Sequence, residues 1–255
     1  IRLLFVHTTR SSYSNAWSAG RRLLPQALAS GNVADCAYCY YLLGVAALHL
    51  GRWDEAQAIA AEGAAVSERT GSIRYAVTLR LLQAWIALEA QRFEDAYRIS
   101  REERAAAENG GWVNARQMSL LVGGAAALEL GRLSEAATDL ELLRDWHARE
   151  RVLMDWYWEA QLHTYLAELS LRRRDLERAT IEAAAAREAA MATPERTWRG
   201  RAYVTSALVA IERRAFDAPP GNFGFVNSDL AFSGNRAIGG SFNGFQVYDI
   251  SNGSN

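Results

Sequence analysis

Apolar residues recur three or four positions apart along most of the chain, in segments of about 17 to 20 residues rich in Ala, Leu, Glu and Arg. This spacing places the apolar side chains on one face of an α-helix, and these residue types favour helix. Gly and Thr-Pro turn signals separate the segments. The pattern predicts helices at 34–50, 53–69, 72–90, 93–109, 112–130, 133–149, 152–173, 175–192 and 195–213.

A short block recurs at a near-constant interval. Gly51-Arg-Trp-Asp-Glu-Ala56 returns in variant form at 91–96, 131–136 and 174–179, which are intervals of 40, 40 and 43 residues. Periods of this length indicate stacked supersecondary units. We therefore expect a series of antiparallel helix hairpins. The first twelve residues fit this register poorly, because His7 stands where a small residue is expected.

Small residues occupy matching places in the two helices of each predicted hairpin. The pairs include Gly44 with Ala56, Gly124 with Ala136 and Ala167 with Ala179. Small side chains at both places allow two helices to approach closely. A large residue beside the turn, such as Trp53 in the second hairpin, is expected to fill the remaining gap.

The set Gly44, Gly51, Trp53 and Ala56 resembles the tetratricopeptide repeat, and it recurs as Gly124, Gly131, Leu133 and Ala136. The match covers about residues 11–218 and departs from the usual repeat of about 34 residues in its length. The long form is similar to the superhelical sensor region of bacterial regulators of the maltose-activator type. The resemblance implies a mainly α fold, a right-handed α-α superhelix, whose first helices line a concave groove.

Transferring the contact positions of that family by register gives a set of candidate groove residues that mixes aromatic and charged groups. An equally good interpretation is that Tyr38, Tyr41 and Trp85 simply pack between neighbouring hairpins. The candidates are Tyr38, Tyr41, His49, Thr78, Trp85, Glu89, Met118, Glu129, Gln161, Thr164, Glu168 and Arg172.

A second concentration of aromatic residues lies at 156–158, and Trp158, Trp198 and Tyr75 share one register position. Aromatics at one repeat position most often form a packing ladder between units. A platform for a sugar or an aromatic ligand is the alternative.

The last part of the chain has a different chemistry. Pro219-Pro220-Gly221 stops the helical pattern, and short runs at 229–232, 236–240 and 245–250 predict an antiparallel β-meander. The run from Asp229 to Asn252 resembles one blade of the LVIVD-type β-propeller repeat. A single blade is incomplete, so we expect a truncation or a join near residue 218. The predicted domains are 1–218, the helical array, and 219–255, the partial blade.

Composition and motifs exclude several classes of function. With 28 basic and 29 acidic residues the net charge is −1, so nothing favours direct binding to nucleic acid or to a membrane surface. Cys36 and Cys39 form a lone C-x-x-C, which is better explained as two small residues on an apolar helix than as a metal or redox site. The four histidines lack the spacing of metal ligands, and no P-loop or nucleophile elbow is present.

These observations predict a non-catalytic interaction or effector-sensing module without cofactor, metal or catalytic residues. It would bind a protein or peptide partner or a small-molecule effector, as part of a larger bacterial regulatory or signalling protein. We expect it to be cytoplasmic. A purely structural array that spaces or oligomerises attached domains is the second hypothesis. A fragment of an enzyme whose catalytic domain lies elsewhere is the third.

Overall fold

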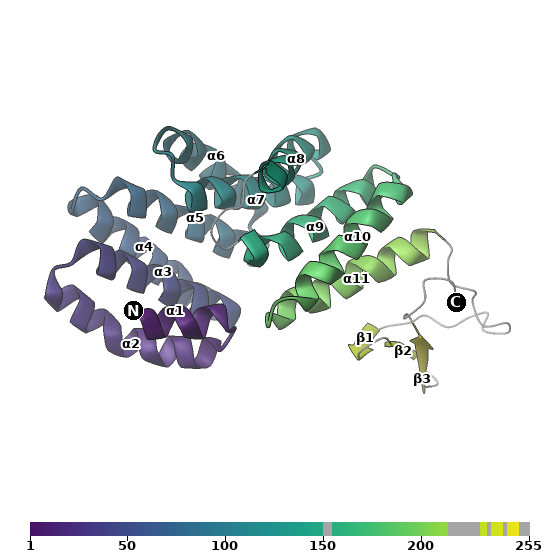
Figure 1. Ribbon diagram of the computed structural model, residues 1–255, viewed down its shortest axis with the longest axis horizontal. Coiled ribbons are helices and arrows are strands. Elements are labelled where there is room, and N and C mark those ends of the chain that lie inside the picture. Colours follow the sequence, from purple (N-terminus) through teal and green to yellow (C-terminus); the bar gives the residue numbers. More distant parts are fainter. Residues whose placement is uncertain (150–154, 214–229, 234–235, 242–243, 250–255) are drawn as a thin grey trace. The chain divides into compact units, whose positions relative to one another are not determined.

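The structure is a computed structural model that describes residues 1–149, 155–213, 230–233, 236–241 and 244–249. The described part is mainly α-helical, as the periodicity predicts, and its helices follow one another along the chain as an array (Figure 1). Predicted and observed helix boundaries differ by one residue or less from α3 to α8. The helices are α1 (Arg2–Thr9), α2 (Tyr13–Ser30), α3 (Val33–His49), α4 (Trp53–Arg69), α5 (Ile73–Glu89), α6 (Phe93–Asn109), α7 (Val113–Glu129), α8 (Leu133–Arg149), α9 (Asp155–Arg172), α10 (Leu176–Met191) and α11 (Arg196–Glu212).

The chain divides into two compact units, Ile1–Trp158 and Glu159–Asn255. The predicted domain boundary at residue 218 lies outside the described residues. None of the helices in the described ranges is long and apolar enough to span a membrane.

The turns of the first unit share one conformation at a regular interval. Left-handed residues with φ of 54° to 74° occur at evenly spaced positions, namely Ser11, Gly31, Gly51, Gly71, Gln91, Gly111 and Gly131. At most of these turns the following amide reaches back into the preceding helix, as when the Arg132 N–H donates to the Ala127 carbonyl at 2.8 Å. This bond closes the helix end and reverses the chain. Each repeat period of the first unit therefore consists of two equal halves.

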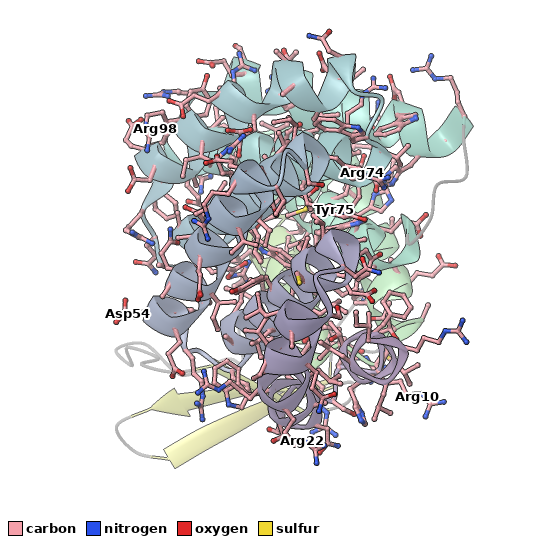
Figure 2. The ribbon with its side chains drawn as sticks, turned by 90° about the vertical axis from the view of Figure 1, so that its left-hand side faces the viewer. Arg10, Arg22, Asp54, Arg74, Tyr75 and Arg98 are labelled. Atoms are coloured by element: carbon pink, nitrogen blue, oxygen red, sulfur yellow. The ribbon has the colours of Figure 1, made fainter. Side chains whose placement is uncertain are left out.

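The first unit has an inner and an outer layer of helices. The first helices of the hairpins, α1, α3, α5 and α7, contact one another as well as their hairpin partners. Thirteen of the 17 residues of α7 are buried, against three of the 17 residues of α6. The first helices therefore form the apolar core, and charged side chains such as Arg22, Asp54 and Arg98 extend outward from other helices (Figure 2).

Small residues bring the helices together, as expected, but not always within one hairpin. A Cβ added to Gly124 would lie 2.8 Å from Leu140 Cγ in α8, the partner helix. A Cβ added to Gly44 would instead lie 2.8 Å from Leu82 in α5, the first helix of the next hairpin. The expectation that Trp53 fills a gap is wrong, because 45% of this side chain is exposed at the start of α4.

A buried ion pair fastens α7 between its neighbours. Arg104 in α6 donates two hydrogen bonds of 2.6 Å to the carboxylate of Asp139 in α8, and it also reaches the Ser119 carbonyl in α7 at 3.3 Å. Only 1% of the Asp139 side chain is exposed. Three helices thus share one charged contact, and α7 is held in register.

The second unit has its own core. Ala167, Ala179 and Ala183 form one buried cluster with Val209, which joins α9, α10 and α11. The close approach predicted for Ala167 and Ala179 is therefore confirmed. The strands β1 (Leu230–Ser233), β2 (Arg236–Ser241) and β3 (Gly244–Asp249) pair in that order as an antiparallel sheet. Their relation to a propeller blade stays a prediction.

Helix α11 exposes apolar residues at positions whose equivalents in α5 are buried. Val204, Leu208 and Ile211 are 44%, 45% and 51% exposed. The equivalent residues of α5 are Leu81, Trp85 and Leu88, and each of these is at most 6% exposed. Helix α11 therefore exposes an apolar face whose equivalent in α5 is buried.

Gln91→Gly should raise the free energy of unfolding by up to about 1 kcal/mol, because glycine adopts the φ of 60° without a Cβ clash. Gly131→Ala should lower it by about 1 kcal/mol for the opposite reason. Urea unfolding followed by circular dichroism measures both. Gly200→Ala is the control, since this helical glycine has open space around its Cβ and alanine should stabilise it. A less stable Gln91→Gly variant would contradict the argument from backbone strain.

Asp139→Ala should lower the free energy of unfolding by about 3 kcal/mol, because it leaves the Arg104 guanidinium, whose side chain is 15% exposed, without its carboxylate partner. Glu94→Ala removes an exposed pair with Arg132 and should cost less than about 1 kcal/mol. Denaturant midpoints compare the two. Equal losses would show that the buried pair has no special role in holding α7.

Candidate functional site

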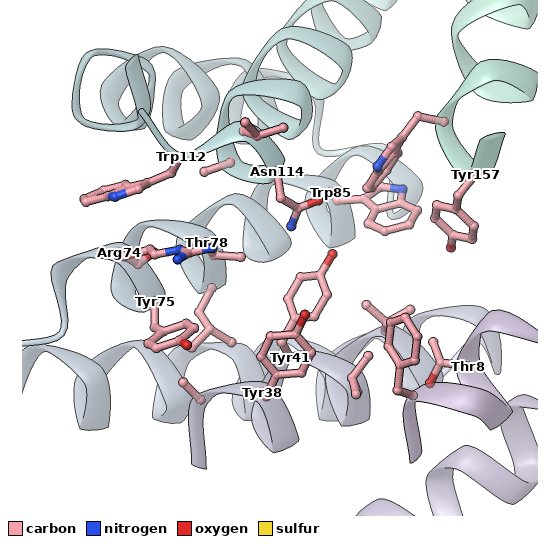
Figure 3. A pocket seen from close by; sticks show the side chains of 18 of the residues that line it. Thr8, Tyr38, Tyr41, Arg74, Tyr75, Thr78, Trp85, Trp112, Asn114 and Tyr157 are labelled. Carbon is pink, nitrogen blue, oxygen red and sulfur yellow. Dashed lines mark hydrogen bonds between the residues drawn. The ribbon is translucent and has the colours of Figure 1, made fainter. Parts of the chain in front are cut away.

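The inner helices of the first unit enclose a cavity of about 270 Å³ (Figure 3). It is lined by α1, α3, α5, the start of α7 with the turn before it, and the first unit's last two residues. Eight of the lining residues are aromatic. The lining comprises Phe5, Thr8, Thr9, Ala37, Tyr38, Tyr41, Leu42, Val45, Arg74, Tyr75, Thr78, Leu79, Trp85, Gly111, Trp112, Val113, Asn114, Ala115, Tyr157 and Trp158.

The repeat register explains why these side chains meet. Tyr38 and Thr78 are one repeat period apart and occupy equivalent positions on α3 and α5. Arg74 and Asn114 occupy the position one turn earlier on α5 and α7. Because residues four apart share a helix face, both positions face the same space. The cavity therefore follows from the stacking of parallel first helices.

An aromatic cluster around Trp85 closes one part of the cavity. The Trp85 ring lies 5.2 Å from Trp158 and 6.3 Å from Tyr157, measured between centroids. On its other side it meets the edge of His49 at 5.7 Å, and His49 stacks on Tyr13 at 4.2 Å. The His49 Nε2 is also 3.0 Å from the Tyr157 hydroxyl. These contacts hold Trp85, which is only 2% exposed, in a fixed orientation.

The middle of the cavity contains Tyr41 and Asn114, whose side chains point toward one another (Figure 3). The Tyr41 hydroxyl and the Asn114 amide both lie near the Met118 sulfur, at 3.7 and 3.8 Å. Burial raises the pKa of Tyr41 to about 12. Its phenol is therefore protonated at neutral pH and remains available as a hydrogen-bond donor.

Arg74 is the one charged side chain in the lining of the described cavity. It lies in the first turn of α5, and its guanidinium is 5.9 Å from the Tyr75 ring. No carboxylate within the described ranges forms an ion pair with it. By contrast Arg80, further along the same helix, binds Glu103 at 3.0 Å. The cavity wall thus carries one positive charge without a compensating negative one.

The indole of Trp158 adds an unusual donor. Its Nε1 atom is buried and has no hydrogen-bond partner among the residues that the structure describes, and 2% of the residue is exposed. A buried donor without an acceptor costs about 1–3 kcal/mol. A ligand that offers an acceptor to this atom would recover that cost.

The structure brings four of the predicted groove residues to the cavity, namely Tyr38, Tyr41, Thr78 and Trp85. Met118 is fully buried beneath Tyr41, and His49 supports Trp85 from behind. Glu89 and Glu129 are half-buried near the ends of α5 and α7, at positions that the lining does not include.

The remaining predicted residues, Gln161, Thr164, Glu168 and Arg172, belong to the second unit. Gln161 and Thr164 are each 1% exposed, and the Thr164 hydroxyl donates to the Ala160 carbonyl at 2.6 Å. Glu168 accepts a hydrogen bond of 3.1 Å from Thr205, and Arg172 is exposed. A binding role for these four stays a prediction.

The expected contact positions miss Arg74, Trp112 and Asn114, which the cavity includes. Arg74 and Asn114 could have been found one helical turn before the candidate position at Thr78 and Met118. Trp112 precedes α7 as its N-cap residue, so helical periodicity carries no signal for it. Tyr75 was grouped with Trp158 by register, and both residues line the cavity.

The two cysteines lie apart from the cavity as small core residues. Cys36 is 5% and Cys39 0% exposed, and both are free thiols. Burial raises the pKa of Cys39 to about 11 and also raises the pKa of Cys36. Thiolate chemistry is therefore disfavoured. The described residues contain no group of three or more His, Cys, Asp or Glu side chains that could hold a metal ion.

The chain matches no model of a known protein family, and no curated protein matches it significantly. The geometry of the cavity is therefore the basis for a functional proposal.

Tyr41→Phe should reduce the loss of stability between pH 10 and pH 12. The folded chain holds the Tyr41 phenol neutral up to a pKa of about 12, whereas an ordinary tyrosine ionises near 10. The stability given by the neutral phenol is complete below pH 10 and disappears as the pH approaches 12. Urea midpoints across this range test the difference. Parallel pH profiles of the native chain and the variant would contradict a buried Tyr41 phenol.

Proposed function

We propose that the first unit is a non-catalytic binding module that holds a ligand or a partner segment in the aromatic cavity. The observation that carries the proposal is a cavity of about 270 Å³ among α1, α3, α5 and the start of α7, whose lining includes eight aromatic side chains. Ligand sites are commonly concave and apolar, with a few polar groups that fix orientation. Tyr41, Arg74 and Asn114 supply such groups here.

The packing around the cavity supports this function. Trp85 is fixed by the rings beside it, so part of the wall is formed before any ligand arrives. Tyr38 is 40% exposed, which leaves a large aromatic surface accessible from solvent. The site thus combines a rigid end with an open entrance.

The resemblance to tetratricopeptide repeats agrees with a groove formed by first helices. On this proposal the module senses an effector or partner within a larger regulatory protein, as the long repeats of maltose-activator-type regulators do. The segment that resembles a propeller blade would belong to a further domain of the same protein.

A second candidate function is a structural array that associates through the exposed apolar face of α11. The exposed Val204, Leu208 and Ile211 of α11 favour it, because equivalent positions are buried in α5. On this hypothesis the cavity binds no ligand, and substitutions in it would alter only stability or self-association.

Tyr38→Ala and Tyr41→Ala should each weaken ligand binding by about tenfold or more, because each removes an aromatic wall. Binding can be followed by tryptophan fluorescence, since Trp85, Trp112 and Trp158 line the cavity. The probes are a panel of short peptides and a panel of oligosaccharides. Trp53→Ala is the matched control, because Trp53 is exposed to a similar extent outside the cavity.

Circular dichroism must show that each variant keeps its helical content. If both tyrosine variants fold and bind the ligand with unchanged affinity, the cavity is not the binding site. Altered sedimentation without any binding would favour the structural array.

A further inference from the structure

The charge distribution around the cavity narrows the class of ligand. Among the described residues, the lining contains one cation, Arg74, and no Asp or Glu side chain. Elsewhere in the first unit arginines bind carboxylates, as Arg80 binds Glu103 and Arg104 binds Asp139. The Arg74 guanidinium faces an aromatic wall and has no anion beside it among the described residues. A ligand with a negative group would complete this site.

Two helix N-termini contribute to the same end of the cavity. The first turn of α5 supplies Arg74 and Tyr75, and the start of α7 supplies Trp112, Val113 and Asn114. In Figure 3 Arg74, Tyr75 and Trp112 lie together at one end. Neither helix has a side-chain hydrogen bond at its N-cap. The positive ends of both helix dipoles therefore favour a negative charge near Arg74.

The rest of the cavity is suited to an aromatic group. Tyr38 and Tyr41 form the middle of the wall, and Trp85 lies eleven residues after Arg74 on α5, roughly 16 Å along the helix axis. The volume of about 270 Å³ is at the small end of the range for ligand sites. A compact ligand with one negative end and a planar apolar body matches these dimensions.

The hydrogen-bonding groups argue against a neutral sugar. A sugar carries many hydroxyl donors, and these require acceptors such as carboxylates or amides. Besides Thr and Tyr hydroxyl groups, which both donate and accept, the described lining has one amide side chain, Asn114, and no carboxylate. The unpartnered Trp158 Nε1 and the protonated Tyr41 hydroxyl are donors. The walls therefore offer charge and donors, which suit a carboxylate better than a polyol.

We propose that the cavity binds a small aromatic carboxylate, with the carboxylate on the Arg74 guanidinium and the ring between Tyr38, Tyr41 and Trp85. This inference rests on the proposed binding function and specifies its ligand class.

The test compares 3-phenylpropionate with its neutral amide, 3-phenylpropionamide, by isothermal titration calorimetry. The native chain should bind the carboxylate at least tenfold more tightly than the amide, because a charge-assisted hydrogen bond to Arg74 is lost in the amide. Added salt should reduce the difference. Maltotriose serves as the neutral sugar probe and should bind more weakly than the carboxylate.

Arg74→Gln should remove the preference, lowering affinity for 3-phenylpropionate about tenfold and leaving affinity for the amide unchanged. Arg74 is exposed and forms no ion pair with a described carboxylate, so the variant should fold. Arg69→Gln is the control, since Arg69 is an exposed arginine at the end of α4 outside the cavity.

The outcomes separate this inference from the broader function. Equal binding of carboxylate and amide, or tighter binding of maltotriose, would overturn the carboxylate assignment and leave the binding module intact. Absence of binding by all three probes would also overturn the carboxylate assignment. The peptide and oligosaccharide panels would then test whether the first unit binds any ligand. A preference that survives Arg74→Gln would show that the anion binds elsewhere.

Discussion

A left-handed residue near each helix end governs the spacing of the first unit. From Ser11 to Gly131 this conformation returns at a constant interval, and the helices from α3 to α8 are all equal in length as a result. Most of these reversals are closed by a backbone hydrogen bond such as that from the Arg132 N–H to the Ala127 carbonyl. Because every turn reverses the chain, alternate helices run parallel. The N-termini of α5 and α7 consequently lie at the same end of the cavity.

The cavity reflects uneven packing within this regular frame. Where Gly44 on α3 meets Leu82 on α5, and where Gly63 on the outer helix α4 meets Tyr40 on α3, neighbouring helices are too close for one added carbon atom. At the equivalent positions Tyr38, Thr78 and Met118, a short side chain on α5 lies between two long ones. Thr78 cannot fill the space that Tyr38 and its neighbours border, so a hollow remains among the aromatic rings. Regular backbones with irregular side-chain sizes thus produce both the tight contacts and the site.

Much of this arrangement was accessible from the sequence, because it depends on local periodicity. Helix boundaries follow from apolar spacing and turn residues, and four of the residues that the register selects, Tyr38, Tyr41, Thr78 and Trp85, line one cavity. The register could not show that Met118 is buried or that Trp53 is exposed, since both depend on how neighbouring helices pack.

The aromatic cluster around Trp85 could not be predicted from the sequence either. It joins His49 to Tyr157 across 108 positions, and no pattern in either segment indicates the other. The absence of an ion pair at Arg74 with any described carboxylate is a similar case, because acidic residues are plentiful in the chain and only the fold determines which of them come near. Handedness of the superhelix, the blade-like tail and the role of the second-unit candidates stay predictions.

The breadth of the cavity has a consequence for cooperativity. In a stacked array each repeat contacts mainly its neighbours, so hairpins can open locally without disturbing distant ones. The cavity wall, however, is drawn from α1, α3, α5 and α7 together, from Phe5 through Ala115. A ligand in contact with all four helices would bind only when all four hairpins are closed. Ligand binding would then couple the opening of hairpins that otherwise open independently, and the first unit would unfold more cooperatively.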